Sequence, residues 1–213
     1  MDFQKHFSLL QNKEVDELYV NLGLRAFSFG LISVFIPLFF LSLGYSLIDV
    51  FVFFGLFSFF HIIFIIPAAY LSSKWGFKHV IIASQPFLIL FFVSLYLLES
   101  SSIPLVLISF FLGVYSALFW FAFHADFAEN SRDGERGKEV AFANIISSVA
   151  SAVAPIIGAL VIVYLNFSYL LVFVILIILA SIIPLLLTED KKDSVDFSLK
   201  KIFANRNLNH SIG

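Results

Sequence analysis

Six apolar segments, each about twenty or more residues long, limit what this chain can fold into. About 20 consecutive apolar residues are enough to cross the hydrocarbon core of a bilayer as a helix, at about 1.5 Å per residue. The segments cover residues 18–43, 50–72, 79–98, 103–123, 140–165 and 168–187. The sequence therefore predicts an all-α integral membrane protein with six transmembrane helices.

Composition supports the same class independently. Apolar residues make up 60% of the chain and charged residues 13%, and 29 residues are Phe. Soluble domains contain about 45–50% apolar and about 25% charged residues. The chain has no Cys, which excludes disulfides, thiolate metal sites and a Cys nucleophile.

The basic residues indicate how the chain crosses the membrane. Of thirteen Lys and Arg residues, only Arg25 lies inside a predicted span, and the connections at 44–49, 99–102 and 166–167 carry none. With six crossings, the other twelve all fall on one side: Lys5, Lys13, Lys74, Lys78, Arg132, Arg136, Lys138, Lys191, Lys192, Lys200, Lys201 and Arg206. Cytoplasmic loops accumulate Lys and Arg. We therefore expect both termini in the cytoplasm and the protein in the plasma membrane (the cell inner membrane of a bacterium).

The chain divides into three parts. Residues 1–17 form a cytoplasmic lead, residues 18–187 a six-helix transmembrane domain, and residues 188–213 a cytoplasmic tail or a truncated central loop. The short connection at 99–102 separates two groups of three spans. This organisation is typical of two three-helix inverted repeats.

The connection between the second and third spans carries a recognisable pattern. The segment Ala69-Tyr70-Leu71-Ser72-Ser73-Lys74-Trp75-Gly76-Phe77-Lys78 resembles the G-x-L-a-D-r-x-G-r-k loop of the major facilitator superfamily. Leu71, Lys74, Gly76 and Lys78 match it, while Ser73 replaces the acidic residue that helps lock the loop in that family. Gly76 permits a left-handed turn, and the lysines suit the negative end of the preceding helix. A basic turn that only fixes topology is the alternative.

A second match lies in the fifth span. Its segment Ala154-Pro155-Ile156-Ile157-Gly158-Ala159 resembles the G-P-x-x-G-G element of the same family, with Ala in place of Gly twice. Ser147, Ser151, Ala154 and Gly158 share one helical face, which would let another helix approach closely. Pro155 is expected to kink the span. Helix packing alone would also favour such a face.

The resemblance implies a fold and a function. Members of this superfamily have two six-helix halves with the substrate site between them, so the chain resembles an N-terminal half and is expected to be a fragment of a twelve-helix protein. The implied function is secondary active transport of a small solute by alternating access. The implied partners are the lipid bilayer, a small-molecule substrate, a coupling proton or ion, and the missing C-terminal half or a second copy. No feature indicates nucleic-acid binding.

Arg25 is a candidate for the substrate pathway. A charged residue at the centre of a bilayer costs about 2.5–3.5 kcal/mol even on the milder scales, so its presence needs a reason. It either extends its side chain toward the inner interface, with Glu17 as counter-charge, or faces a central cavity and binds an anionic substrate or a proton-linked carboxylate. In the superfamily, helices one and four line that cavity, which favours the second alternative.

Three residues at the inner end of the fourth span are further pathway candidates. Trp120 and His124 follow a stripe of small residues, where Trp120 could stack on a ligand and His124 could change charge near neutral pH. They could equally be interfacial anchors. Asp126 lies nearly on the opposite face from His124 and could pair with Arg25 or with an Arg of the following loop.

His61 and Asn144 are candidates for gating or helix contacts, together with Pro155 and Gly158. His61 lies near the middle of the second span, where a neutral imidazole bonded to a neighbouring helix is favoured over a proton relay. Asn144 suits an interhelical hydrogen bond. The resemblance implies that spans two and five contact the other half, where both residues could tune gating.

Two other function classes remain open from the sequence. A complete six-helix carrier or channel could act as a homodimer. A membrane enzyme is disfavoured because the chain lacks H-E-x-x-H, G-x-S-x-G and aspartate-rich metal motifs. We therefore predict no catalytic residue, no metal site and no cofactor.

Overall fold

The computed structural model describes residues 13–132 and 134–186, where the regular structure is entirely helical. Within these ranges, six helical segments are long and apolar enough to cross a membrane. The elements are α2 (Lys13–Ile32), α3 (Phe35–Ser42), α4 (Leu47–Trp75), α5 (Phe77–Leu97), α6 (Leu105–Asn130), α7 (Arg136–Tyr164), α8 (Phe167–Ala180) and the 3-10 turn η2 (Pro184–Leu186). The expected class, an all-α membrane protein with six spans, is confirmed.

The helices extend beyond the apolar segments at several ends. Helix α6 continues to Asn130, whereas the apolar segment ends at residue 123. Helix α4 begins earlier than the apolar segment because Ser46 and Asp49 form a capping box, in which each side chain satisfies a backbone N–H of the first turn. An apolar segment shows which part of a helix suits lipid, but the helix itself ends where its backbone hydrogen bonds end, which can be beyond the apolar segment.

The first span is interrupted between α2 and α3 at Ser33 and Val34. Pro37 explains the position of the break, because a proline ring has no N–H to offer the carbonyl four residues earlier and clashes with it. That carbonyl belongs to Ser33. Pro67, by contrast, lies inside the uninterrupted helix α4, so a proline alone does not decide where a span breaks.

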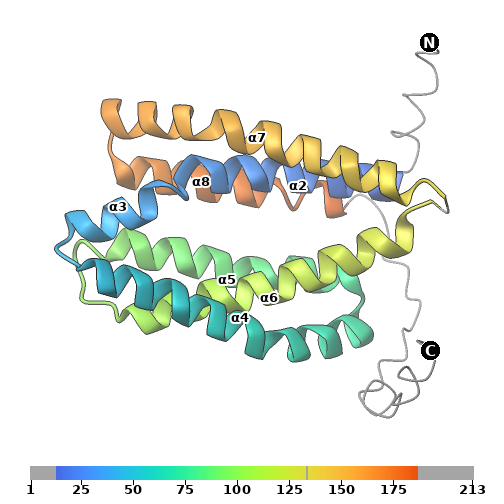
Figure 1. Ribbon diagram of the computed structural model, residues 1–213, viewed down its shortest axis with the longest axis horizontal. Coiled ribbons are helices and arrows are strands. Elements are labelled where there is room, and N and C mark those ends of the chain that lie inside the picture. Colours follow the sequence, from blue (N-terminus) through green and yellow to red (C-terminus); the bar gives the residue numbers. More distant parts are fainter. Residues whose placement is uncertain (1–12, 133, 187–213) are drawn as a thin grey trace, which may run out of the picture.

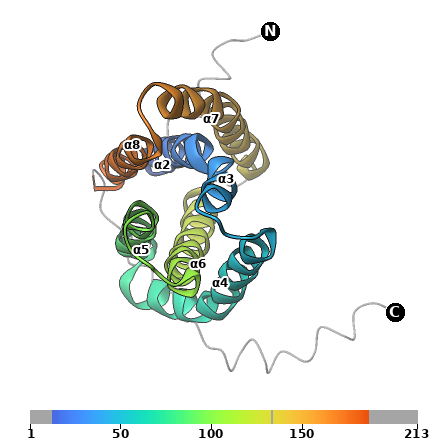
Figure 2. The same ribbon diagram turned by 90° about the vertical axis from the view of Figure 1, so that its left-hand side faces the viewer.

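The helices form two groups of three. Helices α2, α7 and α8 make one group and α4, α5 and α6 the other, with α3 leading from the first group to the second (Figures 1 and 2). The most extensive packing joins α2 to α7 and α4 to α6. The first span thus pairs with the fifth and the fourth with the second. Two inverted three-helix repeats would give this pairing, and the repeat relation itself stays a prediction.

Glycines permit the closest approaches between helices. A Cβ added at Gly113 of α6 would lie 2.5 Å from the Cβ of Phe60 in α4. A Cβ at Gly158 of α7 would collide with the backbone carbonyl of Leu31 in α2. Small residues at such positions let membrane helices pack through their backbones.

Pro155 lies at one of these approaches. It releases the carbonyl of Ser151 from its helical hydrogen bond, and helix α7 nonetheless runs without interruption. Gly30 of α2 lies against this point, where an added Cβ would be 3.3 Å from the Ser151 oxygen and 2.8 Å from the Cβ of Ala154. The small face expected on the fifth span therefore packs against α2.

A larger side chain at Gly158 should separate α7 from α2. Forcing extra atoms into a packed contact costs about 1–3 kcal/mol or more, and here the obstacle is backbone. We expect Gly158→Leu to lower the thermal unfolding midpoint in mild detergent. Gly55→Leu is the control, because no atom lies within 4 Å of a Cβ added at Gly55. Equal midpoints for the two variants would contradict this packing.

Candidate functional site

A cavity of about 460 Å³ lies between the two groups of helices, with walls from α2, α3, α4, α6 and α7. Its volume is in the range of small-molecule sites, about 300–1,000 Å³. The lining is mainly aromatic and apolar, with one cationic side chain, Arg25, and no acidic one among the described residues. The other polar side-chain groups are the indole N–H of Trp120 and the hydroxyl groups of Tyr115, Ser33, Ser116, Ser147 and Ser151.

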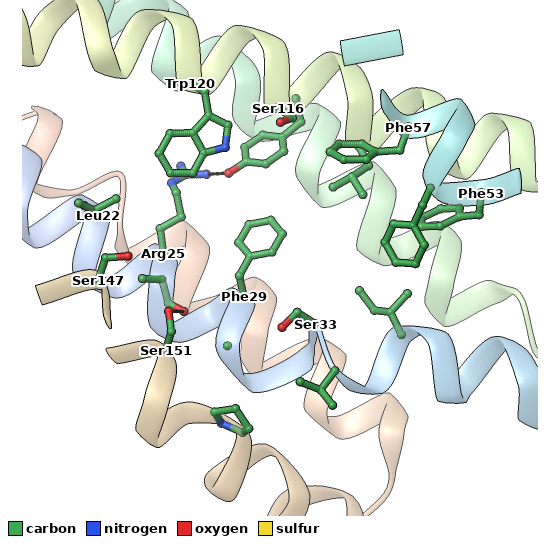
Figure 3. Close-up of a pocket in the computed structure, with 18 residues that line it drawn as sticks. Leu22, Arg25, Phe29, Ser33, Phe53, Phe57, Ser116, Trp120, Ser147 and Ser151 are labelled. Carbon is green, nitrogen blue, oxygen red and sulfur yellow. Dashed lines mark hydrogen bonds between the residues drawn. The ribbon is translucent and has the colours of Figure 1, made fainter. Parts of the chain in front are cut away.

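Arg25 extends from α2 across to α6 (Figure 3). Its side chain is buried, with 2% of the residue surface exposed, and its Nη1 donates a hydrogen bond to the hydroxyl of Tyr115. The guanidinium carbon lies 3.7 Å from the ring centroid of Phe119. Its Nε and Nη2 have no acceptor among the described residues. The cation is thus held by aromatic faces and one hydroxyl, with two of its three nitrogen atoms left without an acceptor among the described residues.

The structure does not place Arg25 at the inner interface or beside Glu17. Glu17 accepts a hydrogen bond from Nζ of Lys78 over 3.4 Å, and both side chains are buried. The alternative in which Arg25 extends toward the interface with Glu17 as its counter-charge is therefore wrong. Arg25 contributes instead to the cavity wall.

The loop between α4 and α5 is anchored by the same ion pair. Gly76 has φ of +88°, in the region that glycine alone adopts readily, so the expected left-handed turn is present. Lys78 follows it in the first turn of α5 and reaches Glu17 of α2. Lys74 instead lies exposed over the ring of Tyr70, 4.6 Å from its centroid. An ion pair to α2 thus joins this loop to the first span, although Ser73 replaces the family's acidic residue.

Trp120 and His124 stack on one face of α6. Their ring centroids are 5.4 Å apart, with an interplanar angle of 23°. Trp120 lines the main cavity, whereas His124 lines a second hollow of about 420 Å³ that it shares with Trp120 and His61. Buried Nδ1 of His61 has no partner among the described residues. The expected hydrogen bond from His61 to a neighbouring helix is therefore not formed by this atom.

Asp126 and Asn144 occupy different surroundings. Asp126 is buried, and its Oδ1 accepts a hydrogen bond from Nδ2 of Asn130 over 2.7 Å. It is not among the residues that line the main cavity. Asn144 of α7 lines a smaller hollow of about 110 Å³ together with Trp120 and His124. The candidates thus separate into a cavity group, Arg25 and Trp120, and a group nearer the ends of α6 and α7 that carry the basic loop.

The profile of the Major Facilitator Superfamily matches residues 18–207. The chain belongs to this family. A search of curated proteins gave no match. Family membership identifies this facilitator as a membrane transporter, and its six apolar helices make it a multi-pass integral membrane protein.

A second polar cluster, around Glu139, could not be predicted from the sequence of this facilitator. Glu139, at the start of α7, is buried, and its Oε2 accepts the backbone N–H of Arg132 over 3.2 Å. Tyr19 of α2 donates to the backbone carbonyl of Glu139 over 3.3 Å. The loop between α6 and α7 is thus fixed to the first span. Among the described residues, no cluster of three His, Asp or Glu could hold a metal ion.

Removing one member of the Lys78–Glu17 pair should destabilise the facilitator. Breaking a buried ion pair leaves a buried charge without its partner and costs about 3–5 kcal/mol. We expect Lys78→Met to lower the thermal unfolding midpoint in detergent and Glu17→Gln combined with Lys78→Met to recover part of the loss. The exposed Lys74→Met is the control and should change the midpoint little. A loss in Lys74→Met as large as that in Lys78→Met would refute this role.

Proposed function

We propose that this facilitator is the N-terminal half of a secondary active transporter that moves a small solute by alternating access. The observation that carries the proposal is the cavity between the two helix groups, which holds a buried, partly unsatisfied Arg25. An ionisable group inside the membrane region marks a substrate or ion pathway by default. Helices α2 and α6, the first and fourth spans, both contribute to the wall of this cavity, and the family resemblance implies that these two spans line the substrate site.

We assign the candidate residues to two roles. Arg25 and Trp120 line the cavity and contact the solute, while His124 and Asp126 lie further along α6 on the route to the loop side. His61 shares a hollow with His124. We propose that the contacts of His61 and Asn144 change when the helices move relative to the partner half, so that both residues tune gating.

A second six-helix half would cover the exposed faces of α4 and α7. Both helices bury few of their residues within the chain, and both contribute to the cavity wall. Their large exposed apolar side chains include Phe51, Phe59, Ile62, Val149 and Ile156. A C-terminal half of the same protein is the partner we propose. Cysteine cross-links between identical α4 positions would instead support a homodimer.

We propose that the end of the bundle that carries the basic residues faces the cytoplasm and that the membrane is the plasma membrane. Lys13, Lys74, Lys78, Arg132 and Arg136 lie at helix ends that meet at one end of the bundle (right in Figure 1). The opposite end carries no Lys or Arg in its connections. The positive-inside rule places the basic end in the cytoplasm.

Cysteine labelling tests alternating access without knowledge of the substrate. This chain has no Cys, so once any Cys beyond it is changed to Ser, a single Ser151→Cys or Ser116→Cys introduces a unique thiol in the cavity wall. In the full-length protein, we expect a membrane-impermeant maleimide to label these thiols from either side of sealed vesicles, because the cavity opens to each side in turn. Labelling would be followed by mass shift in right-side-out and inside-out vesicles.

The matched control is Leu176→Cys. Leu176 lies near the middle of the sixth span, Phe167–Leu186, is 58% exposed on the bundle surface and does not line the described cavity. A thiol that faces lipid should resist the polar reagent from both sides. Labelling of the cavity thiols from one side only, or of the control as readily as of the cavity, would refute alternating access through this cavity.

A further inference from the structure

We propose that the cavity selects an organic monoanion, in which one oxyanion group, such as a carboxylate or sulfonate, is attached to an apolar or aromatic body. Arg25 binds the oxyanion and the aromatic wall holds the body. This inference rests on the proposed transport function and specifies the substrate class for the same cavity.

The first argument is the incomplete satisfaction of Arg25. A guanidinium carries five N–H donors in a planar arrangement that matches an oxyanion. Here Nη1 bonds to Tyr115, while Nε and Nη2 are buried without an acceptor. No described carboxylate forms an ion pair with Arg25. Nε and one Nη together present the two parallel N–H bonds that a bidentate oxyanion accepts.

The second argument is the charge of the cavity as a whole. Arg25 is the sole ionisable side chain, apart from the Tyr115 phenol, among the described residues that line it, and the other polar side-chain groups are serine hydroxyls and the indole N–H of Trp120. A cationic solute would meet a like charge without a carboxylate to offset it. A dianion would leave its second charge in a largely apolar space, which is costly. A solute with one negative charge therefore matches the single positive charge of the cavity wall.

The third argument is the shape of the remaining space. Figure 3 shows Phe29, Phe57 and Phe53 following one another along the cavity on the side of Arg25 away from Leu22. Phe29 stacks on the Tyr115 ring, with centroids 5.9 Å apart and an interplanar angle of 14°. Aromatic faces bind flat apolar groups by stacking and burial. A body attached to the oxyanion would therefore lie along these rings.

Trp120 provides a built-in reporter of binding. Its indole lies beside the guanidinium of Arg25 (Figure 3) and is 39% exposed. Because the indole lies beside the guanidinium, we expect an anion that binds Arg25 to change the surroundings of the indole. Trp75 is the only other Trp, and it lies outside the cavity.

The test uses the full-length protein carrying Trp75→Phe, in nanodiscs of phosphatidylcholine. If Trp residues occur beyond this chain, they are also changed to Phe. The fluorescence of Trp120 is titrated with benzoate and benzenesulfonate, and with neutral benzamide, cationic benzylammonium and dianionic phthalate as matched probes. We expect saturable changes with the two monoanions and at least about tenfold weaker responses to the other probes, the range expected when a charge-assisted hydrogen bond is lost.

Arg25→Gln should weaken benzoate binding by about tenfold or more, whereas Arg25→Lys, which keeps the charge but loses the bidentate geometry, should be intermediate. Equal binding of benzamide and benzoate to the Arg25 protein, or no response to either monoanion at tens of millimolar, would overturn the proposal whether or not the variants fold. Benzamide and benzoate are compared on the same Arg25 protein, so a difference between them does not depend on the stability of any variant.

Two further arms separate the outcomes. Adding phosphatidylglycerol to the nanodiscs tests whether an anionic lipid headgroup occupies the site; competition with benzoate would assign the site to lipid and overturn a solute substrate. Cysteine labelling is independent of anion binding. Two-sided labelling without anion selectivity would leave the transport function standing and remove the substrate class, whereas anion binding with one-sided labelling would do the reverse.

Discussion

The close approach of helices through small residues determines the rest of this structure. In lipid, each spanning segment satisfies its backbone within a helix, so only side-chain size decides how near two helices come. Gly158 brings α7 against the Leu31 carbonyl of α2, and Gly113 brings α6 against Phe60 of α4. Each helix group is tight inside, and the space left between the groups is the cavity. Its wall therefore comes from both groups.

The distribution of charge within the bundle distinguishes structural from functional polar groups. Near the end that carries the basic loops, buried Lys78 pairs with Glu17, and the carboxylate of buried Glu139 accepts a hydrogen bond from the backbone N–H of Arg132. The first interaction fixes the α4–α5 loop to the first span, and the second holds the α6–α7 loop on the start of α7, where Tyr19 of the first span bonds to the Glu139 carbonyl. Arg25, inside the cavity, has a tyrosine hydroxyl and aromatic rings but no described carboxylate. A charge left unpaired in the membrane region is costly, and binding an anion would offset that cost.

The spans, the turn at Gly76 and the small face of the fifth span could be predicted from the sequence, because hydrophobicity, glycine and residue size act locally along a helix. The partners of the polar residues could not. Arg25 and Tyr115 are 90 positions apart, and Glu17 and Lys78 are 61 positions apart. Such pairs depend on which helix faces which, and a single sequence does not contain that information. Pro37 marked the break in the first span, but Pro67 shows why that signal was ambiguous.

The most direct test of the account is exchange transport of a charged probe through the cavity. The full-length protein would be reconstituted into liposomes loaded with unlabelled benzenesulfonate, and entry of radiolabelled benzenesulfonate would be followed over time. The account predicts entry well above the leak of protein-free liposomes, reduced by about tenfold or more by Arg25→Gln in protein that remains folded, and unchanged by Leu176→Cys. Entry that is equal with and without Arg25 would contradict it.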